Sequence, residues 1–157
     1  MVLYLAIFLF IIAFDQISKI MITSSFSEGQ GVNVLEGILN FTYVKNKGAA
    51  FGMLQGARVF FIVITVVAVV AAIIYLVKTR PSSHLERTAI CFLAGGAIGN
   101  FIDRLVLGYV RDFISVEFID FPVFNVADCF VCIGAGLYIL YTLLDFFHSR
   151  NKDGKAS

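Results

Sequence analysis

Long runs of apolar residues dominate the chain, and their lengths predict helices that cross a membrane. A helix rises about 1.5 Å per residue, so roughly 20 apolar residues cross the hydrocarbon core of a bilayer. Four stretches reach that length, at residues 2–22, 59–77, 88–107 and 126–147. The second stretch has no charged residue, whereas the others carry a few near their ends. The pattern predicts an α-helical integral membrane protein with four transmembrane helices, forming a single polytopic domain over residues 1–157.

Two longer connections, residues 23–58 and 108–125, contain stretches in which apolar and polar residues alternate, such as LNFTYV and VEFIDF. Alternation with a period of two is typical of strands. We therefore expect a small β element built from these connections, together with a loop at the membrane edge.

An even number of spans fixes the sidedness of the segments relative to one another. Both termini and the short basic loop 78–87 lie on one side, and the two long connections lie on the other. The tail, residues 148–157, is polar and expected to be disordered. Basic residues favour cytoplasmic termini only weakly under the positive-inside rule. Six lie on the terminal side and five on the other: Lys78, Arg80, Arg87, Arg150, Lys152 and Lys155 against Lys45, Lys47, Arg58, Arg104 and Arg111.

Composition supports a membrane protein and argues against several other classes. Hydrophobic residues make up 59% of the chain and charged residues 15%, with a formal net charge of +1. A balance so close to neutral does not suggest a nucleic-acid partner. The three cysteines lie in apolar runs, so neither a disulfide framework nor a zinc site is expected. Residues 1–14 have no preceding basic residue and no following A-x-A site, so we expect a true span rather than a cleaved leader.

Asp112 and Asp128 are the strongest candidates for chemistry. Two carboxylates held close together cannot both ionise readily, so one keeps a proton while the other stays charged. Such a pair can activate a water and protonate a leaving amine, which is general acid–base hydrolysis of a peptide. The simpler interpretation is that Asn125 caps a helix and Asp128 is its third residue, where negative charge suits the helix dipole. Both interpretations can hold together.

Other polar residues gather near the same side of the membrane. Asp15 and Lys19 are four residues apart on one helical face, so they form an interfacial ion pair, part of a polar site, or both. The segment GGAIGNFIDR contains a G-x-x-x-G pattern that allows close helix packing. Its Asn100 needs hydrogen-bond partners within a span. Arg104, next to Asp103, is either an interfacial anchor or a group that neutralises charge developing on a substrate carbonyl.

Five motifs together carry a family resemblance over nearly the whole chain. They are FDQISK at 14–19, NKGAAFG at 46–52, GNFIDR at 99–104, GYVRDF at 108–113 and FNVAD at 124–128. In this order, on four spans, they resemble the lipoprotein signal peptidases (signal peptidase II), which are bacterial aspartic intramembrane peptidases. The resemblance implies that Asp112 and Asp128 form the catalytic dyad. It implies that the site is built and supported by Asp15, Lys19, Asn46, Gly48, Asn100, Asp103, Arg104 and Asn125.

The resemblance also implies a cellular setting and partners. The protein would lie in the bacterial cytoplasmic (inner) membrane, with both termini cytoplasmic and the sheet and active site at the extracytoplasmic face. Its substrate would be a prolipoprotein carrying diacylglycerol on a cysteine, cut just before that cysteine. Membrane lipid is the other partner, and cyclic peptides of the globomycin type would be inhibitors. No metal or cofactor takes part, and we expect a monomer.

Two other functions remain compatible with four spans and buried charge. An ion- or proton-coupled transporter would place its carboxylates near mid-bilayer or in relay along a path, whereas here they gather at one face. A non-catalytic assembly subunit would use the charges only for helix pairing, and would tolerate replacement of Asp112.

Overall fold

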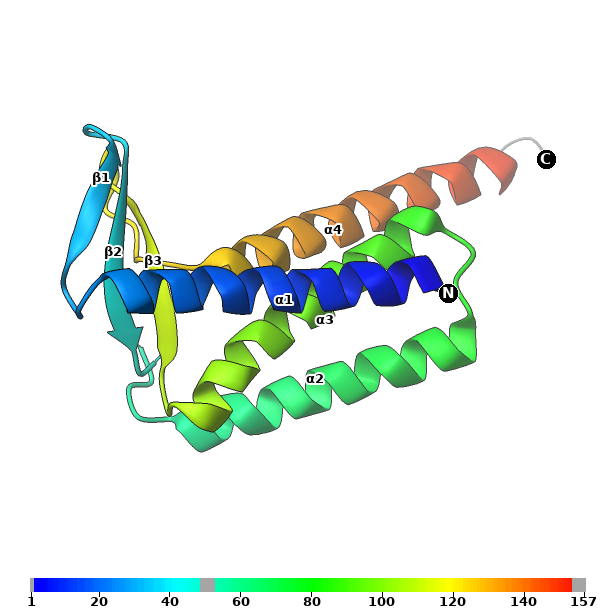
Figure 1. The fold of residues 1–157 in the computed structure, drawn as a ribbon. Helices are drawn as coiled ribbons and strands as arrows, with labels where there is room; N and C mark the ends of the chain where they lie inside the picture. The colour runs from blue at the N-terminus through cyan, green and yellow to red at the C-terminus, as the bar shows by residue number, and fades with distance from the viewer. Residues whose placement is uncertain (1, 49–52, 154–157) are drawn as a thin grey trace.

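A computed structural model describes residues 2–48 and 53–153, and in this part of the chain four long helices carry a small sheet at one end (Figure 1). Each helix is long and apolar enough to cross a membrane. The elements, in chain order, are α1 (Val2–Ser25), β1 (Gly31–Leu35), β2 (Leu39–Asn46), α2 (Arg58–Thr79), α3 (His84–Val106), β3 (Val110–Val116) and α4 (Val126–Asp153).

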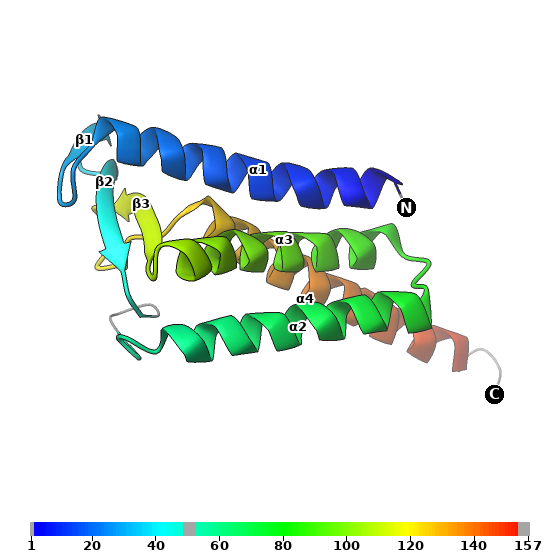
Figure 2. The ribbon, with the colours of Figure 1, turned by 60° about the horizontal axis from the view of Figure 1, so that its bottom comes forward.

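Helix α3 is the centre of the bundle. Figure 2 shows it between α1 and α2, and it also packs against α4. In the most apolar 18-residue stretch of α3, 39% of the residues are buried inside the protein. In the corresponding stretch of α2, none is buried. A helix that is apolar on every side and unburied by protein presents its surface to lipid. The charge-free helix therefore lies at the periphery, and the helix with glycines and polar residues lies inside.

Three glycines of α3 allow its neighbours to approach closely. A Cβ added at Gly95 would lie 2.9 Å from Cγ2 of Ile11 in α1, and one at Gly99 would lie 2.5 Å from Oδ2 of Asp15. A Cβ at Gly96 would collide with the backbone carbonyl of Ala127 in α4. The predicted close packing at the G-x-x-x-G pattern is present, and it brings α1 and α4 together over the polar end of α3.

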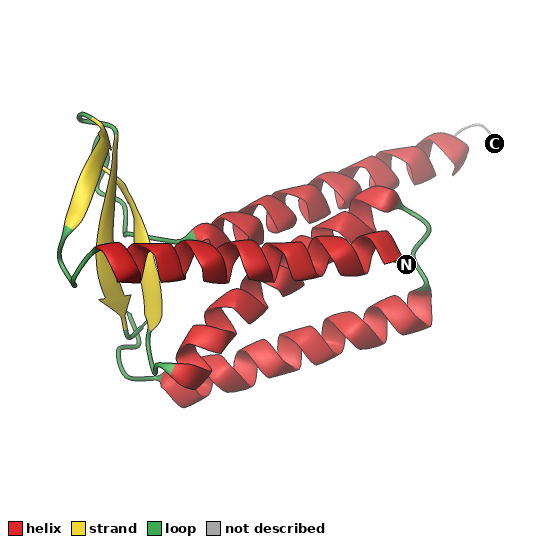
Figure 3. Ribbon diagram, in the orientation of Figure 1, coloured by secondary structure: helices red, strands yellow, loops and turns green. Residues whose placement is uncertain are grey.

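The antiparallel sheet, with strand order β1-β2-β3, covers the end of the bundle opposite the N-terminus (Figure 3). Ile22 of α1, Tyr43 of β2 and Phe113 of β3 form a buried apolar cluster that attaches the sheet to the helices. The stretch LNFTYV lies in β2, as predicted. The strand expected at VEFIDF is wrong, because the third strand lies upstream and most of VEFIDF forms a turn. Phe118 and Ile119 of this stretch are exposed. The alternating pattern therefore belongs to an exposed turn and not to a half-buried strand.

Two helix ends differ from the predicted boundaries by four residues or more. Helix α3 begins at His84, inside the basic loop, because the Ser83 side chain accepts a hydrogen bond from the backbone N–H of Glu86. Helix α4 continues to Asp153, so the disorder expected for the tail is wrong for residues 148–153. Extending an existing helix costs little per residue, and the Arg150 guanidinium lies 5.7 Å from the centre of the Phe146 ring one turn earlier.

Replacing Gly96 by alanine should weaken the contact between α3 and α4. The new Cβ meets backbone, which cannot move aside as a side chain would, so Gly96→Ala should destabilise the protein by roughly 1–3 kcal/mol. Gly136→Ala is the matched control, because a Cβ there has no neighbour within 4 Å and alanine favours helix. Thermal unfolding in detergent should show a lower Tm for Gly96→Ala only. Equal Tm values for both variants would contradict this packing.

Candidate active site

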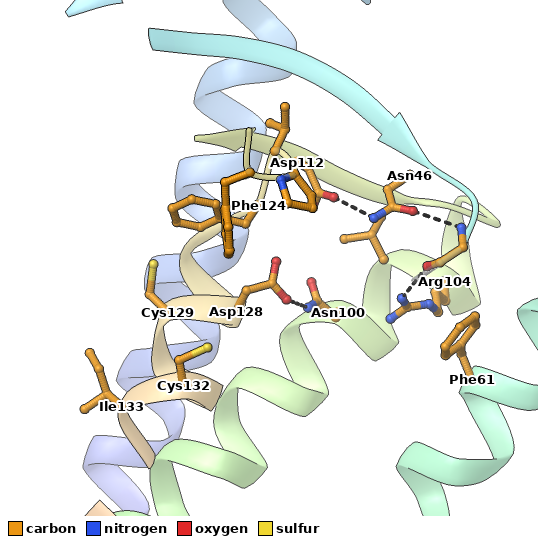
Figure 4. A pocket seen from close by; sticks show the side chains of 15 residues that line it. Asn46, Phe61, Asn100, Arg104, Asp112, Phe124, Asp128, Cys129, Cys132 and Ile133 are labelled. Carbon is orange, nitrogen blue, oxygen red and sulfur yellow. Dashed lines mark hydrogen bonds between the residues drawn. The ribbon is translucent and has the colours of Figure 1, made fainter. Parts of the chain in front are cut away.

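Asp112 and Asp128 approach from different elements and face the same cavity (Figure 4). Asp112 lies in β3, opposite Val44 of β2, and Asp128 lies in the first turn of α4. The cavity has a volume of about 620 Å³ and opens among α2, α3, α4 and the sheet. Its walls are mostly apolar, with a few polar side chains among them. The lining side chains include Phe61, Asn100, Arg104, Val110, Phe124, Cys129, Cys132 and Ile133.

Three asparagine amides orient the two carboxylates. Nδ2 of Asn125 donates to Oδ1 of Asp112 at 2.5 Å, and Nδ2 of Asn46 donates to Oδ2 of the same carboxyl at 2.8 Å. Nδ2 of Asn100 donates to Oδ1 of Asp128 at 2.7 Å, while its Oδ1 accepts from Nδ2 of Asn125 at 3.0 Å. The two carboxylates are thus linked through Asn125 and Asn100, and neither can rotate freely.

Asn125 and Asp128 also form the predicted cap of α4. The backbone N–H of Asp128 donates to Oδ1 of Asn125, and the backbone N–H of Asn125 donates to Oδ2 of Asp128, each at 3.1 Å. This reciprocal arrangement satisfies two N–H groups that the helix leaves open, and the helix dipole favours a negative charge there. The capping interpretation of Asp128 is therefore confirmed. Capping leaves its carboxyl on the cavity, so it does not exclude a chemical role.

Asp112 is 2% exposed, and its environment favours the protonated form. Burial, together with the nearby negative charge of Asp128, raises the pKa of the Asp112 carboxyl from 3.8 to about 7. The amides of Asn46 and Asn125 act in the opposite direction, because they stabilise the charged form. A carboxyl with a pKa near 7 can hold or release a proton at neutral pH, which general acid–base chemistry needs.

A buried ammonium group lies next to the pair of carboxylates. Lys19 is fully buried, and its Nζ lies 2.8 Å from Oδ2 of Asp15 and 3.6 Å from Oδ2 of Asp103. It also donates to Oδ1 of Asn100 at 2.9 Å. Asp15 and Lys19 therefore lie in a buried polar cluster, whereas a simple pair at the lipid–water interface would be partly exposed. Asp15 further accepts from the backbone N–H of Ala127 at 2.9 Å, which joins α1 to the start of α4.

Arg104 lies at the other end of this network. Its Nη2 donates to the carbonyl oxygen of Gly48 at 3.2 Å, and its guanidinium lies 4.6 Å from the centre of the Phe61 ring. The backbone N–H of Gly48 in turn donates to Oδ1 of Asn46 at 2.9 Å. All ten site residues suggested by the sequence are thus connected by hydrogen bonds or ion pairs. The remainder of the NKGAAFG motif, residues 49–52, lies outside the described residues.

Two residues of this network were missed from the sequence, Gln16 and Arg111. Nη2 of Arg111 lies 2.6 Å from Oδ1 of Asp103 and donates to Oε1 of Gln16 at 2.9 Å. Gln16 also donates to the carbonyl oxygen of Gly99 at 3.0 Å. Gln16 lies in FDQISK directly after Asp15, and Arg111 lies in GYVRDF directly before Asp112. Their positions next to candidate site residues are the sequence feature that could have identified them.

The fold and the site together define a class, that of a membrane-embedded protein with two hydrogen-bonded carboxylates on a partly apolar cavity. Among the described residues, no group of three or more histidine, cysteine or acidic side chains could hold a metal ion. The polar groups on the cavity include the carboxylates of Asp112 and Asp128, the amides of Asn46 and Asn100, and the guanidinium of Arg104.

Comparison with known proteins identifies the family. Residues 7–144 match the family model of signal peptidase (SPase) II. The chain is 38% identical to a lipoprotein signal peptidase of Enterococcus faecalis, over 99% of this chain and 95% of the relative. It is 42% identical to one from Brevibacillus brevis, over 86% and 91%. A solved bacterial membrane enzyme superposes with a TM-score of 0.89 at 36% identity, covering 93% of this chain and 90% of that one.

The chain belongs to the signal peptidase II family and is an aspartic peptidase. The family resemblance noted in the sequence is confirmed. Membership decides against the transporter and the assembly subunit as alternative functions.

Removing the buried ammonium should destabilise the protein strongly. Lys19→Met leaves Asp15 and Asp103 without their shared cation, and breaking a buried ion pair typically costs about 3–5 kcal/mol. Lys45→Met is the control, because Nζ of Lys45 pairs with Glu28 at 3.0 Å in a partly exposed position. Unfolding by heat or denaturant in detergent should therefore be affected far more by Lys19→Met. Similar losses in both variants would show that burial of Lys19 does not organise the helices.

Proposed function

We propose that the chain cleaves prolipoproteins whose cysteine carries diacylglycerol, just before that cysteine, and that Asp112 and Asp128 are the catalytic pair. The observation that carries the proposal is that both carboxyls face one cavity while amides from β2, α3 and the connection before α4 fix their positions. Membership in the signal peptidase II family supplies the class of substrate.

In the proposed mechanism the pair shares one proton. Burial and the nearby carboxylate favour a proton on Asp112, although the proton belongs to the coupled pair. The ionised carboxylate takes a proton from a water, whose oxygen attacks the scissile carbonyl. The protonated carboxyl donates its proton to the carbonyl oxygen. When the tetrahedral intermediate collapses, the carboxyl that took the water proton gives it to the leaving amine. A hydroxyl proton of the intermediate passes back to the other carboxylate as the carbonyl re-forms, and this restores the resting state with one proton on the pair.

The polar residues around the pair would have supporting roles. Asn46, Asn100 and Asn125 hold the carboxyls, while Asp15, Lys19 and Asp103 hold α1 against α3, the helix that carries Asn100. Arg104 and Gly48 would border the scissile segment, with Arg104 stabilising negative charge on the carbonyl oxygen. Because the network draws on residues from both ends of the sequence, we treat residues 1–157 as one peptidase domain.

The substrate's lipid would set the depth of the scissile bond. A diacylglyceryl group in the bilayer gains roughly 0.8 kcal/mol per buried CH₂, which places the adjacent peptide bond at the membrane edge. The apolar part of the cavity, with Phe61 and Ile133, would accept side chains and lipid. A cyclic peptide of the globomycin type would occupy the same space.

We further propose the orientation of the chain in the bacterial inner membrane. The termini would be cytoplasmic, and the sheet with the active site extracytoplasmic. Several cations on the sheet side have partners: Arg111 pairs with Asp103, Lys45 pairs with Glu28, and Arg58 donates to two backbone carbonyls. Discounting these paired cations strengthens the positive-inside preference for the terminal side. The site draws on one chain, which is compatible with a monomer.

Replacing either carboxyl should abolish cleavage without unfolding the protein. Asp112→Asn and Asp128→Asn keep size and hydrogen bonding but cannot exchange protons, and positioned acid–base groups typically contribute about 10²–10⁴-fold. Cleavage of a diacylglyceryl prolipoprotein should therefore fall by at least this factor in each variant. Asp120→Asn is the control, because Asp120 is exposed in the turn after β3 and does not line the cavity.

Folded yield and Tm should be measured for all three variants. Near-normal cleavage by a folded Asp112→Asn or Asp128→Asn would refute the dyad. A comparable loss in Asp120→Asn would show that the assay reports folding instead of chemistry.

The proton on Asp112 predicts a pH dependence. Raising the pH through about 7 removes this proton, leaves both carboxyls charged and should lower kcat/KM. Asn46→Ala removes a hydrogen bond that stabilises ionised Asp112, so the pKa should rise and the alkaline limb of the profile should move to higher pH. Asn40→Ala in the same strand is the control, because Asn40 contacts Glu117 instead. An alkaline limb at the same pH in all three proteins would contradict the assignment.

A further inference from the structure

A second cavity of about 620 Å³ lies at the end of the bundle opposite the sheet. It is bordered by Tyr4 near the start of α1, by Leu76 and Val77 at the end of α2, and by the connection that leads into α3. Figures 1 and 2 both show the N-terminus and this connection at the same end of the molecule. The catalytic cavity involves α4 instead of α1, so the two cavities differ both in membrane depth and in the helices that form them.

Two guanidinium groups line this cavity without a negative partner. Among the described residues, neither Arg80 nor Arg87 forms an ion pair with a carboxylate. The nearest acidic residue in sequence, Glu86, is 2% exposed, and its carboxylate accepts a hydrogen bond from the hydroxyl of Tyr75. Two positively charged residues therefore line the cavity, and no carboxylate of the described residues forms an ion pair with either.

Arg87 is held in place by neutral groups. Its Nε donates to the carbonyl oxygen of Pro81, and its guanidinium lies 5.6 Å from the centre of the Tyr4 ring. The hydroxyl of Tyr4 is hydrogen-bonded to Nδ1 of His84 at 2.7 Å. These contacts fix the position of the charge without neutralising it. A fixed, partly desolvated guanidinium is well suited to binding the oxygens of a phosphate.

We propose that this cavity binds an anionic phospholipid from the bilayer, with its phosphate between Arg80 and Arg87 and an acyl chain against Leu76 and Val77. The charge calls for an anion, and the apolar wall on a helix that is exposed to lipid along its whole length calls for a hydrocarbon chain. Basic pockets between transmembrane helices commonly bind acidic headgroups. A basic peptide segment would be repelled, and a free phosphate would leave the apolar wall uncovered.

Lipid binding to the purified full chain in detergent tests this proposal. Native mass spectrometry with phosphatidylglycerol and phosphatidylcholine of identical acyl chains gives a Kd for each lipid. The wild type should bind phosphatidylglycerol at least about fivefold more tightly than phosphatidylcholine. In Arg80→Gln the ratio of the two Kd values should be about fivefold smaller than in the wild type. Lys78→Gln changes a cation that follows Val77 in α2 but is not among the lining residues, so this variant should keep the preference.

Two further measurements keep the result decisive. Arg80 makes no side-chain hydrogen bond with the described residues, so Arg80→Gln should fold normally. Arg87→Gln, by contrast, removes a structural contact. It is therefore paired with Arg87→Lys, which keeps the charge and should keep the preference for the anionic lipid. Equal affinity for both lipids, or an unchanged preference in Arg80→Gln, would overturn the proposal. So would displacement of phosphatidylglycerol by millimolar inorganic phosphate, which would indicate a simple anion site. The readout is binding, so it does not depend on the peptidase function.

Discussion

The buried ammonium group of Lys19 is the interaction on which the rest of this structure depends. A charge removed from water at the edge of a bilayer is stable only if it is surrounded by acceptors. Here the acceptors come from α1 through Asp15 and from α3 through Asn100 and Asp103. Asp15 also binds the first turn of α4 through the N–H of Ala127. Satisfying one cation therefore sets the relative positions of three helices at the depth where the cavity lies.

The proposed chemistry follows from this arrangement through shared amides. The side chain of Asn100 connects the buried ion pair to the carboxyl pair, because its oxygen accepts from Lys19 and its nitrogen donates to Asp128. Asn125 similarly links the cap of α4 to Asp112. An amide can bridge two carboxyls without adding charge, which leaves the pair free to hold a single proton. The helices thus position the groups, and the low exposure of Asp112 raises its pKa.

Much of this architecture could be predicted from the sequence, and the misses have physical causes. The apolar runs predict the four helices, and the spacing of Asn125 and Asp128 predicts the cap of α4. The strand expected at VEFIDF was wrong because apolar residues that alternate on an exposed loop resemble a half-buried strand. The start of α3 was placed too late, although Ser83 and Glu86 have the spacing of a capping box. Arg111 was missed because its partner Asp103 lies on another element, and sequence alone does not show that contact.

The central claim is that the pair of carboxyls carries one proton at neutral pH. Infrared difference spectroscopy detects the carbonyl stretch of a protonated carboxyl, which separates from that of a carboxylate. Wild-type protein in lipid should show such a band that disappears as the pH rises through about 7, in keeping with the pKa of Asp112. The band should be lost in Asp112→Asn and, for Asp128→Asn, should titrate at a lower pH because the neighbouring charge is removed. A band that persists unchanged in both variants, or no band above pH 5, would contradict the shared proton and with it the aspartic mechanism proposed for this site.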